Sequence, residues 1–151
     1  MILMSRSLRM AALAGTVPMN DWREMREKEQ PNKEMYQAWS HVVSEQLRTQ
    51  GDAALRYTYP IQVWKLGGLS WIALGGEVVV DYSLRFRHEL GDNAWVFGYC
   101  NDVMAYIPNE RVLKEGRYEG DTSKYVYGRV GRWAPGLEDQ IVGKTHELLG
   151  R

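Results

Sequence analysis

Two short apolar runs that both end in glycine constrain this chain more than any other feature. Leu69–Leu74 runs into the glycine pair that precedes Glu77, and Ala94–Phe97 runs into Gly98. A short apolar run bounded by glycine is typical of a buried strand. Binding groups often lie where a rigid strand ends in a loop. We therefore expect functional side chains just beyond these glycines.

The run Leu69–Leu74 has a partner immediately before it in the sequence. Tyr57–Leu66 reads as a strand, and Gly67-Gly68 is a two-residue turn signal, so the two runs predict a β-hairpin. Proline cannot donate a ladder hydrogen bond, so Pro60 is expected at an edge strand or near the start of its strand. The stretch from Met1 to Gly15 predicts a strand or an irregular lead-in.

Helical periodicity of the apolar residues predicts helices around these strands. The expected helices are a short one capped by Asn20 or Asp21 and ending at Glu29, one from Pro31 to Gly51, one from Glu77 to Leu90, a short one from Asn109 to Glu115, and a terminal one beginning at Pro135. The apolar face of the helix from Glu77 to Leu90 is expected to consist of Val79, Val80, Tyr82, Leu84, Phe86 and Leu90. The stretch from Tyr118 to Trp133 is expected to be an ordered loop rich in glycine and aromatics. Together these elements predict an α+β fold, a small mixed sheet with a β-hairpin and flanking helices, in one domain over residues 1–151.

Composition excludes several classes of function. The 19 Lys and Arg side chains balance 19 Asp and Glu, so no net field attracts nucleic acid or anionic lipid. The longest uncharged run, Met10 to Asn20, is too short for a transmembrane helix and makes a poor signal peptide, which leaves localisation open. The single Cys100 excludes an internal disulfide and is expected to be a buried free thiol. The 6 Trp and 9 Tyr against 2 Phe suggest an aromatic-lined, wet cleft.

No complete catalytic motif is present. The sequence lacks the zinc-protease, nucleophile-elbow, dinucleotide and phosphate-loop patterns. A catalytic zinc needs about three protein ligands, but His41, His88 and His146 fall on three different expected helices. His88 and Glu89 are expected to form a surface pair. For Glu77, the alternative to a functional role is a carboxylate in the first turn of a helix, favoured by the helix dipole.

Five short motifs, in order and at an approximate spacing, resemble one known family. They are Tyr59-Pro60-Ile61-Gln62-Val63-Trp64; Gly75-Gly76-Glu77; Gly98-Tyr99-Cys100-Asn101 followed by Tyr106-Ile107; Tyr118-Glu119-Gly120; and Tyr127-Gly128. The chain resembles the later part of the catalytic domain of neutral/alkaline non-lysosomal ceramidases, especially the shorter bacterial ceramidase-like proteins. The resemblance runs from the region of Val17 to the C-terminus.

The resemblance implies a zinc-dependent amidohydrolase that cleaves N-acylsphingosine-like lipid amides to a sphingoid base and a fatty acid. It implies that Glu77 and Tyr106 are zinc ligands and that Tyr118 is a catalytic residue near the metal. It also implies that Tyr99 and Asn101 contact substrate. These roles agree with metal chemistry, since a carboxylate is a good zinc ligand and zinc can bring a phenolate, of ordinary pKa about 10, into use near neutral pH.

The same resemblance implies that this chain supplies half of the metal site. The family's two histidine ligands and its serine-bearing segment belong to the earlier half of the catalytic domain, and larger members carry a C-terminal immunoglobulin-like domain. We therefore expect Zn²⁺ to be shared with a missing N-terminal half, and the chain alone to be inactive. The family's Pro-Gly-Glu-Phe/Pro-Thr and Tyr-Ile/Val-Thr-Thr are replaced here by Gly75–Val79 and Tyr106–Asn109, which leaves the substrate preference open.

Two alternatives of other classes stay open. One is an aromatic-lined glycan- or lipid-binding module without catalysis, which the Trp and Tyr content supports. The other is a structural or interaction remnant, which predicts that Glu77 and Tyr106 point apart. A fragment of a larger domain should also expose an apolar patch, expected beside the hairpin Tyr57–Leu74 and the lead-in Met1–Leu13.

Overall fold

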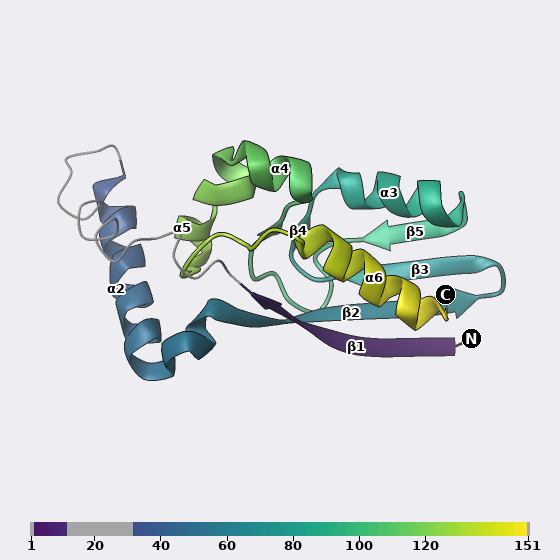
Figure 1. Ribbon diagram of the computed structural model, residues 1–151, viewed down its shortest axis with the longest axis horizontal. Coiled ribbons are helices and arrows are strands. Elements are labelled where there is room, and N and C mark those ends of the chain that lie inside the picture. Colours follow the sequence, from purple (N-terminus) through teal and green to yellow (C-terminus); the bar gives the residue numbers. More distant parts are fainter. Residues whose placement is uncertain (1, 12–31, 151) are drawn as a thin grey trace.

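The structure is a computed structural model that describes residues 2–11 and 32–150, and a four-stranded sheet lies at its centre (Figure 1). In spatial order the strands are β1 (Ile2–Ala11), β2 (Arg56–Leu66), β3 (Leu69–Leu74) and β5 (Ala94–Phe97). The first three are antiparallel neighbours, and β5 runs parallel to β3. The small mixed sheet, the β2–β3 hairpin and the flanking helices confirm the predicted α+β class.

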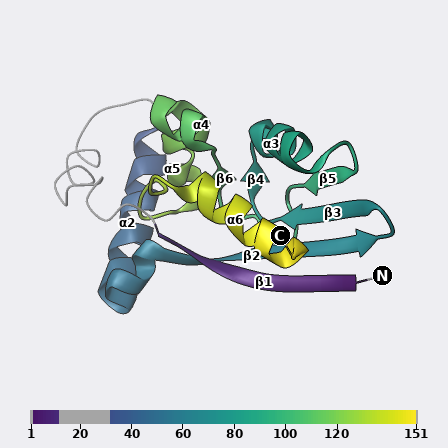
Figure 2. The same cartoon turned by 45° about the vertical axis from the view of Figure 1, so that its right-hand side comes forward.

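Helices cover one face of this sheet and one end of it. They are α2 (Lys33–Gln50), α3 (Val80–Leu90), α4 (Glu110–Glu115), α5 (Lys124–Tyr127) and α6 (Leu137–Leu149), with a 3-10 turn, η1 (Gly51–Leu55), and a π-helical turn, η2 (Tyr118–Thr122). In Figures 1 and 2, α3 and α6 lie on the same side of the sheet, and α2 stands at its far end beside α5. The main core forms between that side of the sheet and α3 and α6. A second cluster, around Trp39 and Tyr125, joins α2 to α5.

Most of the predicted helices are confirmed. α2 ends at Gly51, whose φ of 54° suits glycine. Asn109 caps α4 by accepting a hydrogen bond from the Val112 N–H at 3.0 Å. α6 begins at Leu137 rather than Pro135, and the predicted loop from Tyr118 onward contains the helical turns η2 and α5. The predicted helix at residues 20–29 lies outside the described residues.

The prediction that Glu77 opens a helix is wrong. Glu77–Val78 form a short strand, β4, which pairs in parallel with β6 (Tyr106–Ile107), and α3 begins only at Val80. The Glu77 N–H donates to the Ala105 carbonyl at 2.9 Å, and the Val79 N–H donates to the Ile107 carbonyl at 3.3 Å. A neighbouring strand therefore satisfies the backbone donors, and the β-branched valines fit the extended conformation. Because Glu77 does not lie in a helix, the alternative that a helix dipole favours its carboxylate is wrong.

The predicted apolar face of this helix is only partly buried. Tyr82 and Phe86 are fully buried in the main core. Val80 and Leu84, predicted for the same face, are 68% and 60% exposed. The periodicity therefore identified the helix but overestimated the width of its buried stripe.

Of the two positions predicted for Pro60, an edge strand or a place near the start of its strand, the edge position is wrong, because β2 lies between β1 and β3. Pro60 pairs with Ser7 of β1, whereas pairing with β3 begins at Ile61. Pro60 thus precedes the β3 ladder and takes no place in it, so its missing N–H is tolerated there.

The second face of the sheet carries a row of tryptophans. Trp64, Trp71 and Trp95 are cross-strand partners on β2, β3 and β5, and cross-strand partners share a face. The Trp71 ring stacks on Phe97 with centroids 4.3 Å apart, while Trp71 and Trp95 remain 37% and 50% exposed. We call these four residues the tryptophan face. Exposed tryptophan side chains thus lie at the hairpin, where the patch is expected, whereas the side chains of residues 1–13 lie outside the described part.

Candidate functional site

Gly76 joins the two segments that leave β3 and β5. Its φ is 71°, and a Cβ at this position would lie 2.7 Å from both the Ala105 oxygen and the Ile107 Cγ1, so only glycine fits. The Gly76 N–H donates to the Asp102 carbonyl at 2.7 Å, and the Gly76 carbonyl accepts from the Tyr99 N–H at 2.8 Å. These bonds bring the residues after both predicted strand ends into one site.

Glu77, Tyr99 and Tyr106 meet at this site. Glu77 and Tyr106 are register partners on β4 and β6, and the Tyr99 hydroxyl donates to the Glu77 Oε2 at 2.7 Å. A hydrogen bond with the Glu77 carboxylate is the main reason that the pKa of Tyr106 rises to about 12. The same carboxylate raises the pKa of Tyr99. Both phenols are therefore held protonated against one carboxylate, because ionisation would place like charges side by side.

Further aromatic rings surround Tyr106. Tyr118, the first residue of η2, packs edge-on against it with centroids 5.5 Å apart, and Tyr127 does the same at 6.3 Å. The Trp133 indole N–H donates to the Tyr106 carbonyl at 2.8 Å and fixes the backbone of β6. We call Glu77, Tyr99, Tyr106 and Tyr118 the tyrosine cluster.

Sequence reasoning assigned no site role to Tyr127 or Trp133. The available signal was the glycine- and aromatic-rich stretch that contains both residues. Tyr99 and Tyr118 are 63% and 50% exposed. The tyrosine cluster therefore lies on an open surface rather than in the aromatic-lined cleft that composition suggested.

Asn101, the other predicted substrate contact, lies beside the sheet. Its side-chain amide donates to the Gln62 Oε1 of β2 at 3.4 Å. Tyr99 and Asn101 both have positive φ, 58° and 67°, a conformation that costs a non-glycine residue about 1 kcal/mol or more. The turn they form directs the two side chains to different partners. Cys100 between them is a half-buried free thiol, and burial raises its pKa.

A second tyrosine–carboxylate pair anchors the same loop from the other side. The Tyr57 hydroxyl of β2 donates to the Asp102 carboxylate, and the Arg129 guanidinium lies 4.8 Å from the Tyr57 ring centroid. Burial, followed by the bond to Asp102, raises the pKa of Tyr57 to about 12. This pair ties the loop to the sheet and so helps to hold Tyr99 near Glu77.

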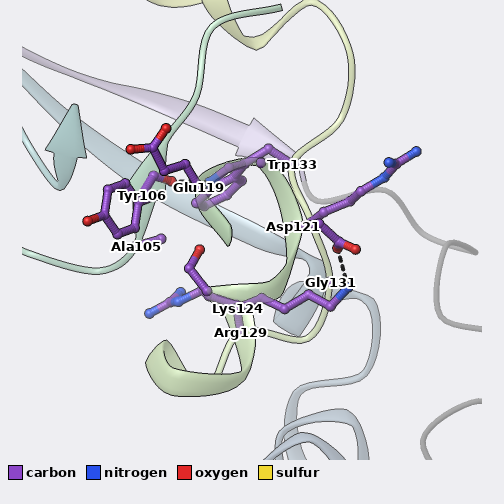
Figure 3. A pocket seen from close by; sticks show the side chains of 11 residues that line it. Ala105, Tyr106, Glu119, Asp121, Lys124, Arg129, Gly131 and Trp133 are labelled. Carbon is purple, nitrogen blue, oxygen red and sulfur yellow. Dashed lines mark hydrogen bonds and ion pairs between the residues drawn. The ribbon is translucent and has the colours of Figure 1, made fainter. Parts of the chain in front are cut away.

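A small pocket adjoins Tyr106 (Figure 3). Figure 3 shows the ion pair between Lys124 and Asp121 on the side away from Tyr106 and Glu119. The pocket encloses about 10 Å³, which is room for roughly one water molecule. It is therefore too small to be a substrate pocket.

The donor set fits part of a metal site. Among the described residues no group of three or more His, Cys, Asp or Glu side chains is placed to hold a metal. His146 pairs with Glu89 at 2.6 Å, so the predicted partner of Glu89, His88, is replaced by a residue of α6. The tyrosine cluster offers one carboxylate and adjacent phenols, which are oxygen donors suited to zinc but short of the three protein ligands of a catalytic site.

Comparison with family models, with curated proteins and with solved structures finds no match for this chain. In the part of the chain that the structure describes, no helix combines the length and apolarity needed to cross a membrane.

Proposed function

We propose that this chain is the later half of a zinc-dependent amidohydrolase of the ceramidase type. The observation that carries the proposal is the meeting of Glu77, Tyr99 and Tyr106 around one carboxylate, with Tyr118 against Tyr106. These are four of the five residues to which the family resemblance gives roles. They come from separate segments, and only the fold brings them together. The remnant alternative predicts Glu77 and Tyr106 apart, and their position as register partners on β4 and β6 argues against it.

The roles are those that the family resemblance implies, and each agrees with the chemistry of its group. Glu77 and Tyr106 would hold Zn²⁺ together with two histidines of an N-terminal half. The bound metal would supply Lewis-acid activation of water and of the amide carbonyl. Tyr118 would donate a hydrogen bond to charge that develops on the substrate oxygen. Tyr99 and Asn101 would contact the polar part of a lipid amide such as N-acylsphingosine.

Metal binding by Tyr106 must displace the proton of its hydroxyl group. The pKa of Tyr106 is about 12 without metal, so binding through its phenolate releases a proton near neutral pH. Zinc affinity should then rise about tenfold for each pH unit in that range. This requirement, added to the small number of ligands, explains why the chain alone should not hold zinc tightly.

The test measures bound zinc and fatty-acid release from N-acylsphingosine. The purified chain is assayed alone and with the polypeptide encoded directly upstream of it. We expect neither stoichiometric zinc nor turnover from the chain alone, and both from the mixture. In the mixture, Glu77→Gln and Tyr106→Phe should abolish turnover, whereas Tyr57→Phe, a matched loss of a tyrosine hydroxyl, should retain it.

The outcomes separate the parts of the proposal. Zinc and turnover from the chain alone would defeat the half-site. Zinc binding by the mixture without fatty-acid release would leave the metal site standing and contradict the lipid-amide substrate.

A second candidate is a glycan- or lipid-binding module without catalysis, which the exposed tryptophan face favours. It predicts binding of such a ligand by the isolated chain without any metal. The binding should be insensitive to Glu77→Gln and lost with Trp95→Lys.

A further inference from the structure

A groove lies between α4 and the segment that leads into α6. Its volume is about 380 Å³, within the range of roughly 300–1,000 Å³ that small-molecule sites occupy. The residues that line it are Glu110, Leu113 and Lys114 on α4, and Arg132, Trp133 and Pro135 on the facing segment. None of them belongs to the tyrosine cluster, so the groove is a separate feature of the molecule.

Hydrogen bonds hold the two walls of the groove in place. The Gly136 N–H donates to the Glu110 Oε1 at 2.6 Å, and the Glu110 N–H donates to the Glu138 Oε2 at 2.9 Å. The start of α4 is thereby tied to the start of α6 (Figure 1). The Trp133 indole N–H donates to the Tyr106 carbonyl at 2.8 Å. The groove is therefore formed before any ligand binds, which lowers the cost of ordering its walls around one.

The groove carries positive charge that the protein does not neutralise. Within residues 2–11 and 32–150, the side chains of Arg132 and Lys114 make no hydrogen bond or ion pair, and the Arg132 Nε is buried without an acceptor. Glu110, the one carboxylate in the lining, already accepts from the Gly136 N–H. Two cations and one carboxylate leave the lining with a formal net charge of +1. A bound anion would balance this charge and supply the acceptor that Arg132 lacks.

Arg132 also lines the one-water pocket beside Tyr106. A guanidinium carries several N–H donors in a fixed fork, so a single water leaves most of them for a ligand in the groove.

The remaining lining residues indicate which kind of anion fits. Leu113 and Trp133 are nearly fully buried and Pro135 is exposed, and all three present apolar surface. The indole N–H of Trp133 is already bonded to Tyr106, so the ring offers only carbon contacts. A net charge of +1 matches the single charge of a carboxylate better than a phosphate group, which carries nearly two negative charges. The groove thus favours an organic acid over an inorganic anion.

We propose that this groove binds a small organic carboxylate. Its anionic group would lie at Arg132 and Lys114, and its carbon part against the apolar wall. Arg132 should contribute most, because a half-buried guanidinium can bind a carboxylate through two parallel hydrogen bonds. Lys114 is exposed, and the attraction of an exposed ammonium group is weakened by water. The site uses neither zinc nor Glu77, so its test is independent of the proposed function.

The experiment is an NMR titration of the isotope-labelled chain with sodium benzoate near neutral pH. The Arg132 Nε–H and Trp133 indole N–H resonances report on the groove itself. We expect both resonances to shift saturably, with a dissociation constant of about 1 mM or lower. Benzamide has the same shape without the charge and should bind at least about tenfold more weakly.

Three variants, followed through the Trp133 resonance, assign the binding to particular side chains. Arg132→Met keeps an apolar stem and removes the guanidinium, so it should weaken benzoate binding at least about tenfold. Lys114→Met should weaken it by about fivefold. Arg87→Met is the matched control, because Arg87 is an exposed arginine of α3 that lines another cavity, of about 240 Å³, beside Trp95. It should leave binding within about twofold of the unmodified chain.

Circular dichroism and a thermal melt of each variant separate a lost site from a lost fold. If Arg132→Met does not fold, Lys114→Met decides, because an exposed helical position tolerates the change. Full binding by the folded groove variants, or an equal loss in Arg87→Met, would overturn the proposal.

The ligands provide further ways to overturn it. Benzamide that binds as tightly as benzoate would show that the charge is not recognised. Inorganic phosphate that shifts the same resonances at lower concentration than benzoate would assign the groove to phosphate instead of a carboxylate. The absence of any saturable shift with benzoate would remove the site altogether.

Discussion

Two tyrosine–carboxylate pairs flank the loop at residues 98–105, and they reach the same tyrosine pKa for different reasons. The pKa of Tyr106 rises to about 12 mainly because its hydroxyl bonds to Glu77. The pKa of Tyr57 rises to about 12 mainly because the side chain is partly buried, with the bond to Asp102 second. Arg129 lies over the Tyr57 ring, whereas tyrosine rings surround Tyr106.

This difference indicates that the Tyr57–Asp102 pair anchors the loop, whereas the Glu77–Tyr106 pair belongs to the candidate functional site. Removing the proton from Tyr57 would put a charge in a desolvated position, so that pair is suited to stay neutral and hold the loop. The raised pKa of Tyr106 depends mainly on one neighbouring carboxylate, which lies beside the exposed Tyr99. A cation placed between this carboxylate and the phenol would therefore remove the cause of the raised pKa. The same two functional groups thus support a structural role in one pair and metal binding in the other.

The largest effect should separate the pairs by activity. In the mixture of this chain with the upstream polypeptide, Glu77→Gln removes a charged zinc ligand and should abolish fatty-acid release, a loss of more than about 1,000-fold. Asp102→Asn makes the same chemical change in the anchor pair and should retain zinc and most of the activity. The assay compares turnover and bound zinc for the two variants. Similar losses in both would mean that the pairs do not differ in function.

The next effect concerns the backbone that holds the site together. Gly76→Ala would place a Cβ 2.7 Å from the Ala105 oxygen, so it should lower the free energy of unfolding by more than about 2 kcal/mol. Gly150→Ala is the matched control, since Gly150 also has positive φ, 74°, in the left-handed region, but nothing lies within 4 Å of its Cβ position. It should cost only about 1 kcal/mol, from the left-handed backbone alone. Urea denaturation of both variants measures the difference, and equal losses would contradict the close approach of β4 and β6.

The sequence was sufficient for the features that depend on local signals. The hairpin followed from Gly67-Gly68 between two apolar runs, and α2 followed from its apolar spacing and from Gly51. The strand β5 followed from a short apolar run between polar and glycine residues. In each case the deciding interaction lies within a few residues of the signal.

Features set by distant partners were beyond sequence reasoning. Glu77 was assigned to a helix because Val79 and Val80 fit a helical face, but the carbonyl of Ala105, far along the chain, makes it a strand. Tyr57 gave no sign of its bond to Asp102. The family resemblance selected Glu77, Tyr99, Tyr106 and Tyr118, but their separation in sequence contained no information on the contacts that unite them. Asn101 was placed with them, and only the structure shows its bond to Gln62.

A smaller effect should separate the pairs by stability. Tyr57→Phe removes the hydrogen bond that ties the loop to β2 and should lower the free energy of unfolding by about 1 kcal/mol. Tyr106→Phe keeps its ring packing and loses a hydrogen bond at the surface, so it should change stability by less than about 0.5 kcal/mol. Urea denaturation of the chain alone, near neutral pH, measures both. A larger loss in Tyr106→Phe would reverse the assignment of anchor and site.

The smallest effect is a difference in titration, and it tests the causes of the two pKa values directly. Both values lie above the unfolded tyrosine value of about 10. Each pair therefore contributes stability that is fully present below about pH 10 and is lost as the pH rises through about 12.

Tyrosinate absorbance, with Tyr106→Phe and Tyr57→Phe spectra subtracted to isolate each residue, follows the two groups. Glu77→Gln should return the pKa of Tyr106 most of the way to the unfolded value, because the main cause is removed. Asp102→Asn should leave the pKa of Tyr57 clearly raised, because burial remains. Equal responses would mean that one cause governs both pairs, and the contrast between anchor and site would be lost.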